Sequence, residues 1–319
     1  MHRTFALLLG LLAVAVGSSA DAETLKVAVA QRGFWDSTMV DIAEKQGFFK
    51  EAGLEIEVLY TEGGASTLTP LLAGSIDIAM SNGILGVIGA YAKGAPVRII
   101  SAEGTGAGDA FWYARTETGI KSLKDTNGKT VAFSSPGSST NLILLQLVKQ
   151  AGTSPKLVPT GGAPATYTQV MTGQIDVGWA AAPFGLQNVI DGQIAVIART
   201  TDVPQLANQT IRVNIANVES LKTKRAAIER FMRAYARAID WAYQNPRAVE
   251  IFAANMKLAL PIARKAVDEF YPKAGLQIGE IKGLDLTLKD ALDYKYIPAA
   301  RSEQDIAGLC DILYKPEAK

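Results

Sequence analysis

Short apolar strands alternate with helix-forming segments through most of this chain. The first unit comprises a strand rich in β-branched residues at 25–30, a helix that ends near Gln46, and a second strand at 55–60. A strand–helix–strand unit of this kind joins parallel strands and places the helix on one face of the sheet. The alternation therefore predicts an α/β fold.

A change in composition separates two sets of these units. The glycine-rich stretch 104–109 follows strands expected at 76–80 and 97–101, and it precedes strands expected at 111–115, 130–133, 156–159, 175–179 and 194–198. We expect the chain to cross between two lobes at 104–109 and to return near 209–215. This predicts a first lobe of residues 23–105 and 215–319, mostly helical after the return, and a second lobe of residues 106–214.

The first 22 residues have the character of a secretory signal. Arg3 provides a positive start, residues 5–16 form an apolar run, and small residues lead to Ala20 and Ala22. The apolar run is shorter than the roughly 20 residues that a membrane helix requires. We expect cleavage after Ala22 and a soluble, periplasmic mature protein.

Composition excludes several classes of function. The net charge is +1 without a basic cluster, which argues against nucleic acid as a partner. The sole histidine, His2, lies in the signal, and the sole cysteine, Cys310, is expected as a small buried side chain in a C-terminal helix at 302–314. A Ser-His-Asp triad, a Cys-His pair and a histidine zinc site are therefore absent from the mature chain. We expect a monomer without enzymatic activity, metal or cofactor.

Two lobes joined by two crossings form a cleft. In open α/β sheets the ligand site lies at the carboxyl ends of the strands. This rule selects five loops, at residues 31–36, 81–83, 134–140, 160–162 and 179–184.

Hydroxyl and amide groups in these loops are candidate ligand contacts. Ser134, Gly137, Ser138 and Ser139 precede a long helix, whose N-terminus favours an anion such as a carboxylate or sulfonate. An ordinary N-cap explains the same residues without a ligand. The further candidates of this kind, from three loops, are Arg32, Ser81, Asn82 and Thr160.

Aromatic side chains in the same loops suggest an organic ligand. Trp35 follows the first strand and Trp179 ends the strand expected at 175–179, and Phe34 and Phe184 lie in the same two loops. Large aromatic side chains usually belong to cores, but a ligand can provide the missing packing partner in a cleft. If both tryptophans line the cleft, an apolar or aromatic ligand body is favoured over a bare inorganic anion.

An ordered set of short motifs resembles one family of periplasmic binding proteins. The motifs are Gly47-Phe48-Phe49 with Ala52-Gly53-Leu54, the segment 72–79, Ser122-Leu123-Lys124-Asp125 with Gly128-Lys129-Thr130, and Gly173-Gln174-Ile175-Asp176 leading to Trp179. The chain is similar to the nitrate/sulfonate/taurine-type binding proteins, which include a thiamine-precursor-binding group. The resemblance implies a type II periplasmic binding protein that delivers its ligand to an ABC permease in the inner membrane. It also implies ligand contacts near 31–35, 81–82, 137–139 and 179, whereas Ala180-Ala181-Ala182 before Pro183 is one residue longer than the family pattern and leaves the role of Phe184 open.

These observations predict a binding protein for a small organic anion: a sulfonate, a taurine-like compound or an aromatic carboxylate. A thiamine-precursor pyrimidine is the alternative ligand. A biosynthetic enzyme on the same fold and a sensor domain are the competing classes of function.

Overall fold

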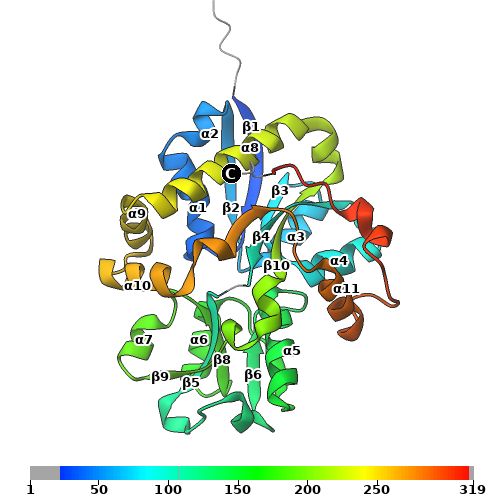
Figure 1. The fold of residues 1–319 in the computed structure, drawn as a ribbon. Helices are drawn as coiled ribbons and strands as arrows, with labels where there is room; N and C mark the ends of the chain where they lie inside the picture. Colours follow the sequence, from blue (N-terminus) through cyan, green and yellow to red (C-terminus); the bar gives the residue numbers. More distant parts are fainter. Residues whose placement is uncertain (1–21, 107, 316–319) are drawn as a thin grey trace, which may run out of the picture.

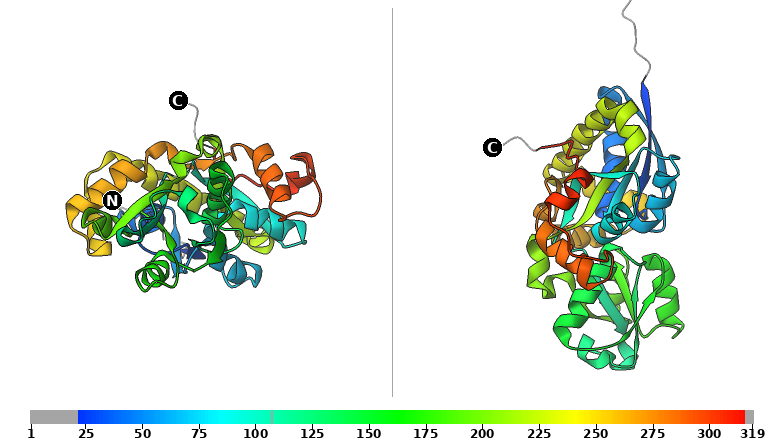
Figure 2. Two further views of the ribbon diagram at one scale, coloured as in Figure 1. Left: turned by 90° about the horizontal axis from the view of Figure 1, so that it is seen from below. Right: turned by 90° about the vertical axis from the view of Figure 1, so that its right-hand side faces the viewer.

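The computed structural model describes residues 22–106 and 108–315, which form two lobes, each built around one β-sheet (Figure 1). The predicted signal at residues 1–22 lies almost entirely outside the described residues and stays a prediction. Seen from the side, the two lobes are stacked along the long direction of the molecule (Figure 2). Within the described part of the chain, no helix is long and apolar enough to cross a membrane.

The first lobe is built on a sheet of six strands with parallel and antiparallel neighbours. β1 pairs in parallel with β2 and β3, as the strand–helix–strand pattern predicts. β10 runs antiparallel to β3 and β4, because it enters the sheet on the way back from the second lobe. The strands, in spatial order, are β11 (Leu276–Gly279), β4 (Val97–Thr105), β10 (Thr210–Asn217), β3 (Ile78–Gly83), β1 (Glu23–Val29) and β2 (Leu54–Tyr60).

Helices cover this sheet and complete the first lobe. The long helix α8 packs against α1 and α2, and the ring of Phe231 on α8 stacks on Phe49 with centroids 5.1 Å apart. Burial of apolar surface, of which such aromatic faces are a part, is the dominant favourable contribution to the stability of a lobe of this size. The helices of this lobe are α1 (Trp35–Lys45), α2 (Phe48–Glu51), α3 (Gly64–Leu72), α4 (Ile84–Ala92), α8 (Val218–Gln244), α9 (Arg247–Met256), α10 (Leu260–Phe270) and α11 (Leu284–Asp293).

The second lobe is a smaller five-stranded sheet with three helices. β6 is parallel to β7 and β8, whereas β5 is antiparallel to β8 and β9. The strands, in spatial order, are β7 (Lys156–Pro159), β6 (Thr130–Phe133), β8 (Val177–Ala181), β5 (Ala110–Arg115) and β9 (Ile194–Arg199), and the helices are α5 (Ser139–Ala151), α6 (Ala163–Met171) and α7 (Leu186–Ile190).

Two segments join the lobes. The first lies between β4, which ends at Thr105, and β5, which begins at Ala110. The second contains two 3-10 turns, Thr200–Asp202 and Pro204–Asn208, and it ends where β10 joins the first sheet at Thr210. We therefore propose lobe limits in which residues 210–214 belong to the first lobe rather than to the second.

The C-terminal segment differs from the sequence-based expectation. The predicted helix at 302–314 is wrong: a 3-10 turn, Gln304–Leu309, is followed by an extended segment in which Cys310 bridges to Ile99 of β4. In this segment the backbone pairs with β4 and is extended, because this pairing stabilises it more than the weak helical periodicity of the sequence would stabilise a helix. Cys310 is half-buried rather than fully enclosed.

Candidate functional site

A small cavity lies between the two lobes and is lined by both. Its volume is about 40 Å³, which is room for one or two water molecules. First-lobe side chains come from the loop after β1, the start of α3, the end of β3 and the middle of β10, and second-lobe side chains come from the turn before α5 and the end of β8. We name this space the inner cavity; its wall consists of Ala30, Gln31, Phe34, Asp36, Gly63, Gly64, Ser81, Gly83, Ser134, Ser138, Ser139, Thr140, Trp179, Ala181 and Arg212.

The turn before α5 forms the second-lobe wall through its hydroxyl groups. Ser138 is the N-cap of α5, and its hydroxyl accepts a hydrogen bond of 3.2 Å from the backbone N–H of Asn141. The Thr140 hydroxyl is 2.8 Å from that of Ser134 and 3.0 Å from that of Ser138. These residues therefore cap the helix and line the inner cavity at the same time.

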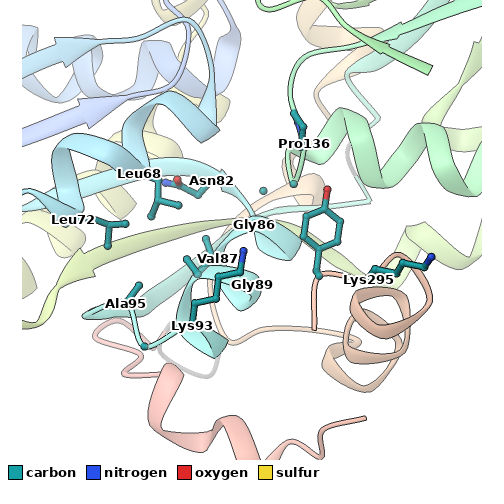
Figure 3. Close-up of a pocket in the computed structure, with 15 residues that line it drawn as sticks. Leu68, Leu72, Asn82, Gly86, Val87, Gly89, Lys93, Ala95, Pro136 and Lys295 are labelled. Atoms are coloured by element: carbon teal, nitrogen blue, oxygen red, sulfur yellow. The ribbon is translucent and has the colours of Figure 1, made fainter. Parts of the chain in front are cut away.

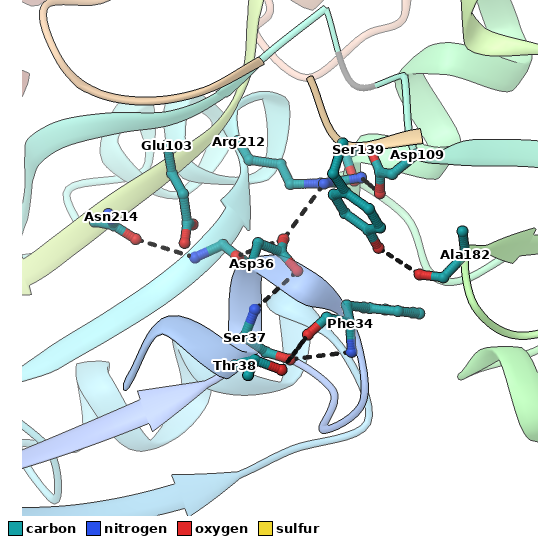
Figure 4. Close-up of polar contacts among 12 residues, drawn as sticks. Phe34, Asp36, Ser37, Thr38, Glu103, Asp109, Ser139, Ala182, Arg212 and Asn214 are labelled. Atoms are coloured by element: carbon teal, nitrogen blue, oxygen red, sulfur yellow. Dashed lines mark hydrogen bonds and ion pairs between the residues drawn. The ribbon is translucent and has the colours of Figure 1, made fainter. Parts of the chain in front are cut away.

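Arg212 joins the two lobes through charged and polar contacts. Its guanidinium donates to Asp109 Oδ2 at 2.7 Å, to Ser139 Oγ at 3.1 Å and to Asp36 Oδ2 at 3.5 Å (Figure 4). Burial alone would lower the pKa of Arg212, but the charges of Asp109 and Asp36 outweigh burial and raise it. The side chain therefore stays positively charged between a strand of the first lobe and a helix of the second.

A second buried carboxyl group lies behind Asp36. Glu103 on β4 is 1% exposed, and its Oε1 accepts a hydrogen bond of 3.0 Å from the Tyr235 hydroxyl. Burial, followed by the charge of Asp36, raises the pKa of Glu103 to about 7. Burial also raises the pKa of Asp36 against the opposing effect of Arg212. Among the described residues, three acidic side chains, Asp36, Asp109 and Glu103, thus lie near one cation, Arg212.

Half of the predicted site residues line the inner cavity. They are Phe34, Ser81, Ser134, Ser138, Ser139 and Trp179. Trp179 is 4% exposed, and its indole Nε1 has no hydrogen-bond partner within the described part of the chain. Phe34 is half-buried, and Phe184 contacts it edge-on with ring centroids 5.4 Å apart. Phe184 therefore supports the cavity wall without lining it, despite the extra residue before Pro183.

The structure places three predicted residues away from the inner cavity. The Trp35 side chain is fully buried in the first lobe, where its ring lies edge-on to Phe252 at 5.4 Å and to Tyr243 at 5.9 Å, so it is a core residue. Arg32 is exposed, and its guanidinium lies 3.8 Å from the centroid of the Tyr60 ring. Thr160 is bound to the Thr166 hydroxyl at 2.6 Å.

The last two predicted residues, Asn82 and Gly137, line a separate and wider groove. Asn82 accepts a hydrogen bond of 3.0 Å from Thr67. The Gly137 carbonyl accepts a hydrogen bond of 3.1 Å from the backbone N–H of Gly86. This bond joins the second lobe to α4 at the border of the groove.

Sequence reasoning missed Asp36 and Arg212 as wall residues. Asp36 lies in the selected loop 31–36 and Arg212 in the crossing expected near 209–215, but neither is among the predicted ligand contacts. One signal was available, because Arg212 is the only charged residue in the segment Thr210–Asn217, in which apolar residues alternate with polar ones. A charge inside a buried strand requires a partner.

The sequence model of the NMT1/THI5-like family matches residues 36–249, which is more than half of the chain. This chain belongs to the NMT1/THI5-like family. A curated relative is the Bacillus subtilis protein YtlA, which is 36% identical over 90 residues. That match spans only 28% of this chain and 27% of YtlA.

Solved structures show that this NMT1/THI5-like protein has the type II periplasmic binding protein fold. The alkanesulfonate-binding protein SsuA from Xanthomonas axonopodis, bound to MOPS, is 16% identical with a TM-score of 0.76, over 92% of this chain and 100% of that one. The nitrate-binding protein NrtA from Synechocystis is 15% identical with a TM-score of 0.72, over 91% of this chain and 86% of that one. The desulfurization enzyme DszB also has this fold, at 14% identity and a TM-score of 0.61 over 87% of this chain and 94% of that one. The fold alone therefore does not separate binding proteins from enzymes.

Proposed function

We propose that this protein is the solute-binding component of an ABC importer and that it works in the periplasm. It captures a small molecule between its lobes and presents it to a permease in the inner membrane. The inner cavity carries this proposal, because it lies between two separately folded sheets and takes polar side chains from both. Family membership and the binding-protein neighbours support the same function.

Binding requires the lobes to separate and close again. A cavity of about 40 Å³ is too small for an organic molecule. The two segments between Thr105 and Ala110 and between Arg199 and Thr210 are the natural hinges for such a motion. A ligand that contacts both lobes shifts the population toward the closed arrangement.

The wall of the inner cavity favours a planar ligand with hydrogen-bonding nitrogens. Phe34 and Trp179 provide aromatic surface, and the unpaired Trp179 Nε1–H requires an acceptor. Asp36 Oδ2 has only long contacts, 3.5 Å to both Arg212 and Ser81, so it is available to an amino group. An amino-substituted pyrimidine meets all three requirements.

The predicted organic anion is the second candidate. Arg212 lines the inner cavity, and SsuA, a structural neighbour, is bound to the sulfonate MOPS. An anion would have to displace Asp36 from Arg212 and would add negative charge beside Asp36 and Asp109. Because of this cost, we rank the amino-substituted pyrimidine above the organic anion as the solute of the inner cavity.

Thermal unfolding in the presence of candidate solutes tests the proposal. A panel of amino-pyrimidines, sulfonates, aromatic carboxylates and nitrate should contain at least one member that raises the Tm in a concentration-dependent way. The variant Trp179→Phe keeps an aromatic ring and loses the N–H donor. About ten times more solute should therefore be needed to give this variant the same rise in Tm. If no panel member raises the Tm, the proposal loses its support, and conversion of a bound solute into a product would favour an enzyme instead.

A further inference from the structure

A wide groove lies on the other side of the contact between α4 and the turn before α5. Its volume is about 620 Å³, and Gly83 lines both this groove and the inner cavity. The first lobe provides α3 and α4, the second lobe provides Pro136 and Gly137, and the C-terminal segment provides Lys295 and Tyr296 (Figure 3). We name it the lateral groove.

Contacts between the lobes form one border of the lateral groove. The backbone N–H of Gly86 donates to Gly137 O at 3.1 Å, and the Tyr296 hydroxyl donates to Asn141 Oδ1 at 2.6 Å. Because Gly86 has no side chain, the second-lobe backbone approaches α4 closely there. Pro136 and Gly137 of the second lobe therefore complete the wall of the lateral groove while the two lobes are in contact at this place.

The floor and walls of the lateral groove are mainly apolar and leave room for a ring or a short chain. Gly89 and Ala90 on α4 provide a shallow floor, and Leu68 and Val87 provide apolar surface. A groove of this volume with an apolar floor and a few polar groups has the dimensions of a small-molecule site.

The lining of the lateral groove is positively charged, whereas that of the inner cavity carries one acidic and one basic side chain, Asp36 and Arg212. The lateral groove's lining contains Lys93 and Lys295 and no acidic residue. Neither lysine makes an ion pair within the described part of the chain. The Lys93 side chain points toward the middle of the groove beside α4, whereas the Lys295 side chain lies at the rim and extends away from Lys93 (Figure 3). Two unpaired cations beside an apolar floor are complementary to an anion with an apolar body.

We propose that the lateral groove is a second binding site, which takes a small organic carboxylate or sulfonate. The anion binds at Lys93, with Lys295 adding positive charge at the rim, and its apolar body lies on Ala90 and reaches Pro136 of the second lobe, which lines the same groove. Because a ligand placed in this way contacts both lobes, it stabilises the closed arrangement and raises the affinity of the inner cavity for its own solute. The proposal does not depend on which solute the inner cavity takes.

Fluorescence titration with 8-anilinonaphthalene-1-sulfonate tests this site on the folded protein. We expect one saturable site, weakened at least about tenfold in the charge-reversal variant Lys93→Glu/Lys295→Glu. Ala90→Phe, which fills the floor, should abolish binding. The matched control Lys121→Glu/Lys124→Glu reverses two exposed charges of the second lobe, and Trp179→Ala alters only the inner cavity; both should bind as the wild type does.

Several outcomes would overturn the proposal. They are the absence of saturable binding, equal weakening in the Lys121/Lys124 control, or unchanged binding in Lys93→Glu/Lys295→Glu. Loss of binding in Trp179→Ala with retention in the lysine variant would move the anion to the inner cavity and also contradict it. Both lysines are exposed, so the variants should keep the wild-type Tm. An unchanged Tm excludes unfolding as the cause of a loss of binding.

Discussion

The guanidinium of Arg212 donates to Asp109 Oδ2 at 2.7 Å and thereby binds a strand of the first lobe to the segment that joins the lobes. The same guanidinium reaches Ser139 of the second lobe and Asp36 of the first. One cation thus lies where the two lobes and one of the hinges meet. Its removal should affect both stability and the closed arrangement.

Arg212→Met should destabilise the protein by about 3–5 kcal/mol, because it leaves Asp36 and Asp109 buried without a positive partner. Urea unfolding followed by circular dichroism measures this loss. Arg301→Met is the control, since Arg301 is exposed and has no ion pair among the described residues. A loss of stability below about 1 kcal/mol in Arg212→Met is the size expected for weak surface ion pairs, and it would contradict a structural role for Arg212.

Gly83→Ala should hold the lobes apart. A Cβ atom at this position would lie 2.2 Å from the backbone oxygen of Gly137, in the opposite lobe, and backbone there cannot yield locally. We expect a larger radius of gyration in small-angle X-ray scattering and weaker solute binding. Gly89→Ala lies in α4, the helix that Gly83 caps, and its Cβ atom would meet only Tyr296, at 3.3 Å, so this variant should scatter as the wild type does. Equal scattering from both variants would show that this contact does not limit closure.

Trp35→Ala and Trp179→Ala should separate stability from binding. Trp35 is fully buried among Tyr243 and Phe252, so its truncation should cost about 3–5 kcal/mol and leave the affinity of the remaining folded protein unchanged. Trp179 lines the inner cavity, so its truncation should reduce affinity at least about tenfold. Chemical denaturation and calorimetry on each variant measure the two effects, and the reverse assignment would refute the site described above.

The two tryptophans also show how far the sequence could predict the site. Trp35 begins α1 and Trp179 lies within β8, both in segments that the carboxyl-end rule selects; of the five selected segments, 160–162 contributes no residue to the wall of the inner cavity. Which ring faces the cavity depends on how α1 is rotated against its neighbours and on which face of β8 carries Trp179, and single-sequence patterns report neither orientation. Trp35 starts α1, whose face turns toward α8 and α9.

Contacts between distant residues account for most of what the sequence could not predict. Arg212 and Asp109 are 103 positions apart, and their pairing follows only from the return of β10 into the first sheet. The α/β alternation and most strands could be predicted, because they depend on local period. The C-terminal segment could not, since its pairing with β4 is non-local.

Stability should depend on pH through Glu103. Burial raises the pKa of Glu103 from an ordinary value of 4.5 to about 7, so the folded state binds this proton more tightly than the unfolded state. The free energy of unfolding should therefore fall by about 3 kcal/mol as pH rises from about 4.5 to about 7. Glu103→Gln keeps an acceptor for Tyr235 and should remove most of this fall. Urea unfolding at pH 5 and pH 8 compares the two proteins, and parallel pH profiles would contradict the assignment.

Native mass spectrometry of the protein purified from the periplasm tests capture of a solute between the lobes most directly. The account predicts a mass excess of one small molecule, which is released on denaturation, recovered unchanged, and absent from the Trp179→Ala protein. Retention of the same molecule by Trp179→Ala, or a wild-type protein that carries no solute and acquires none from a periplasmic extract, would contradict it.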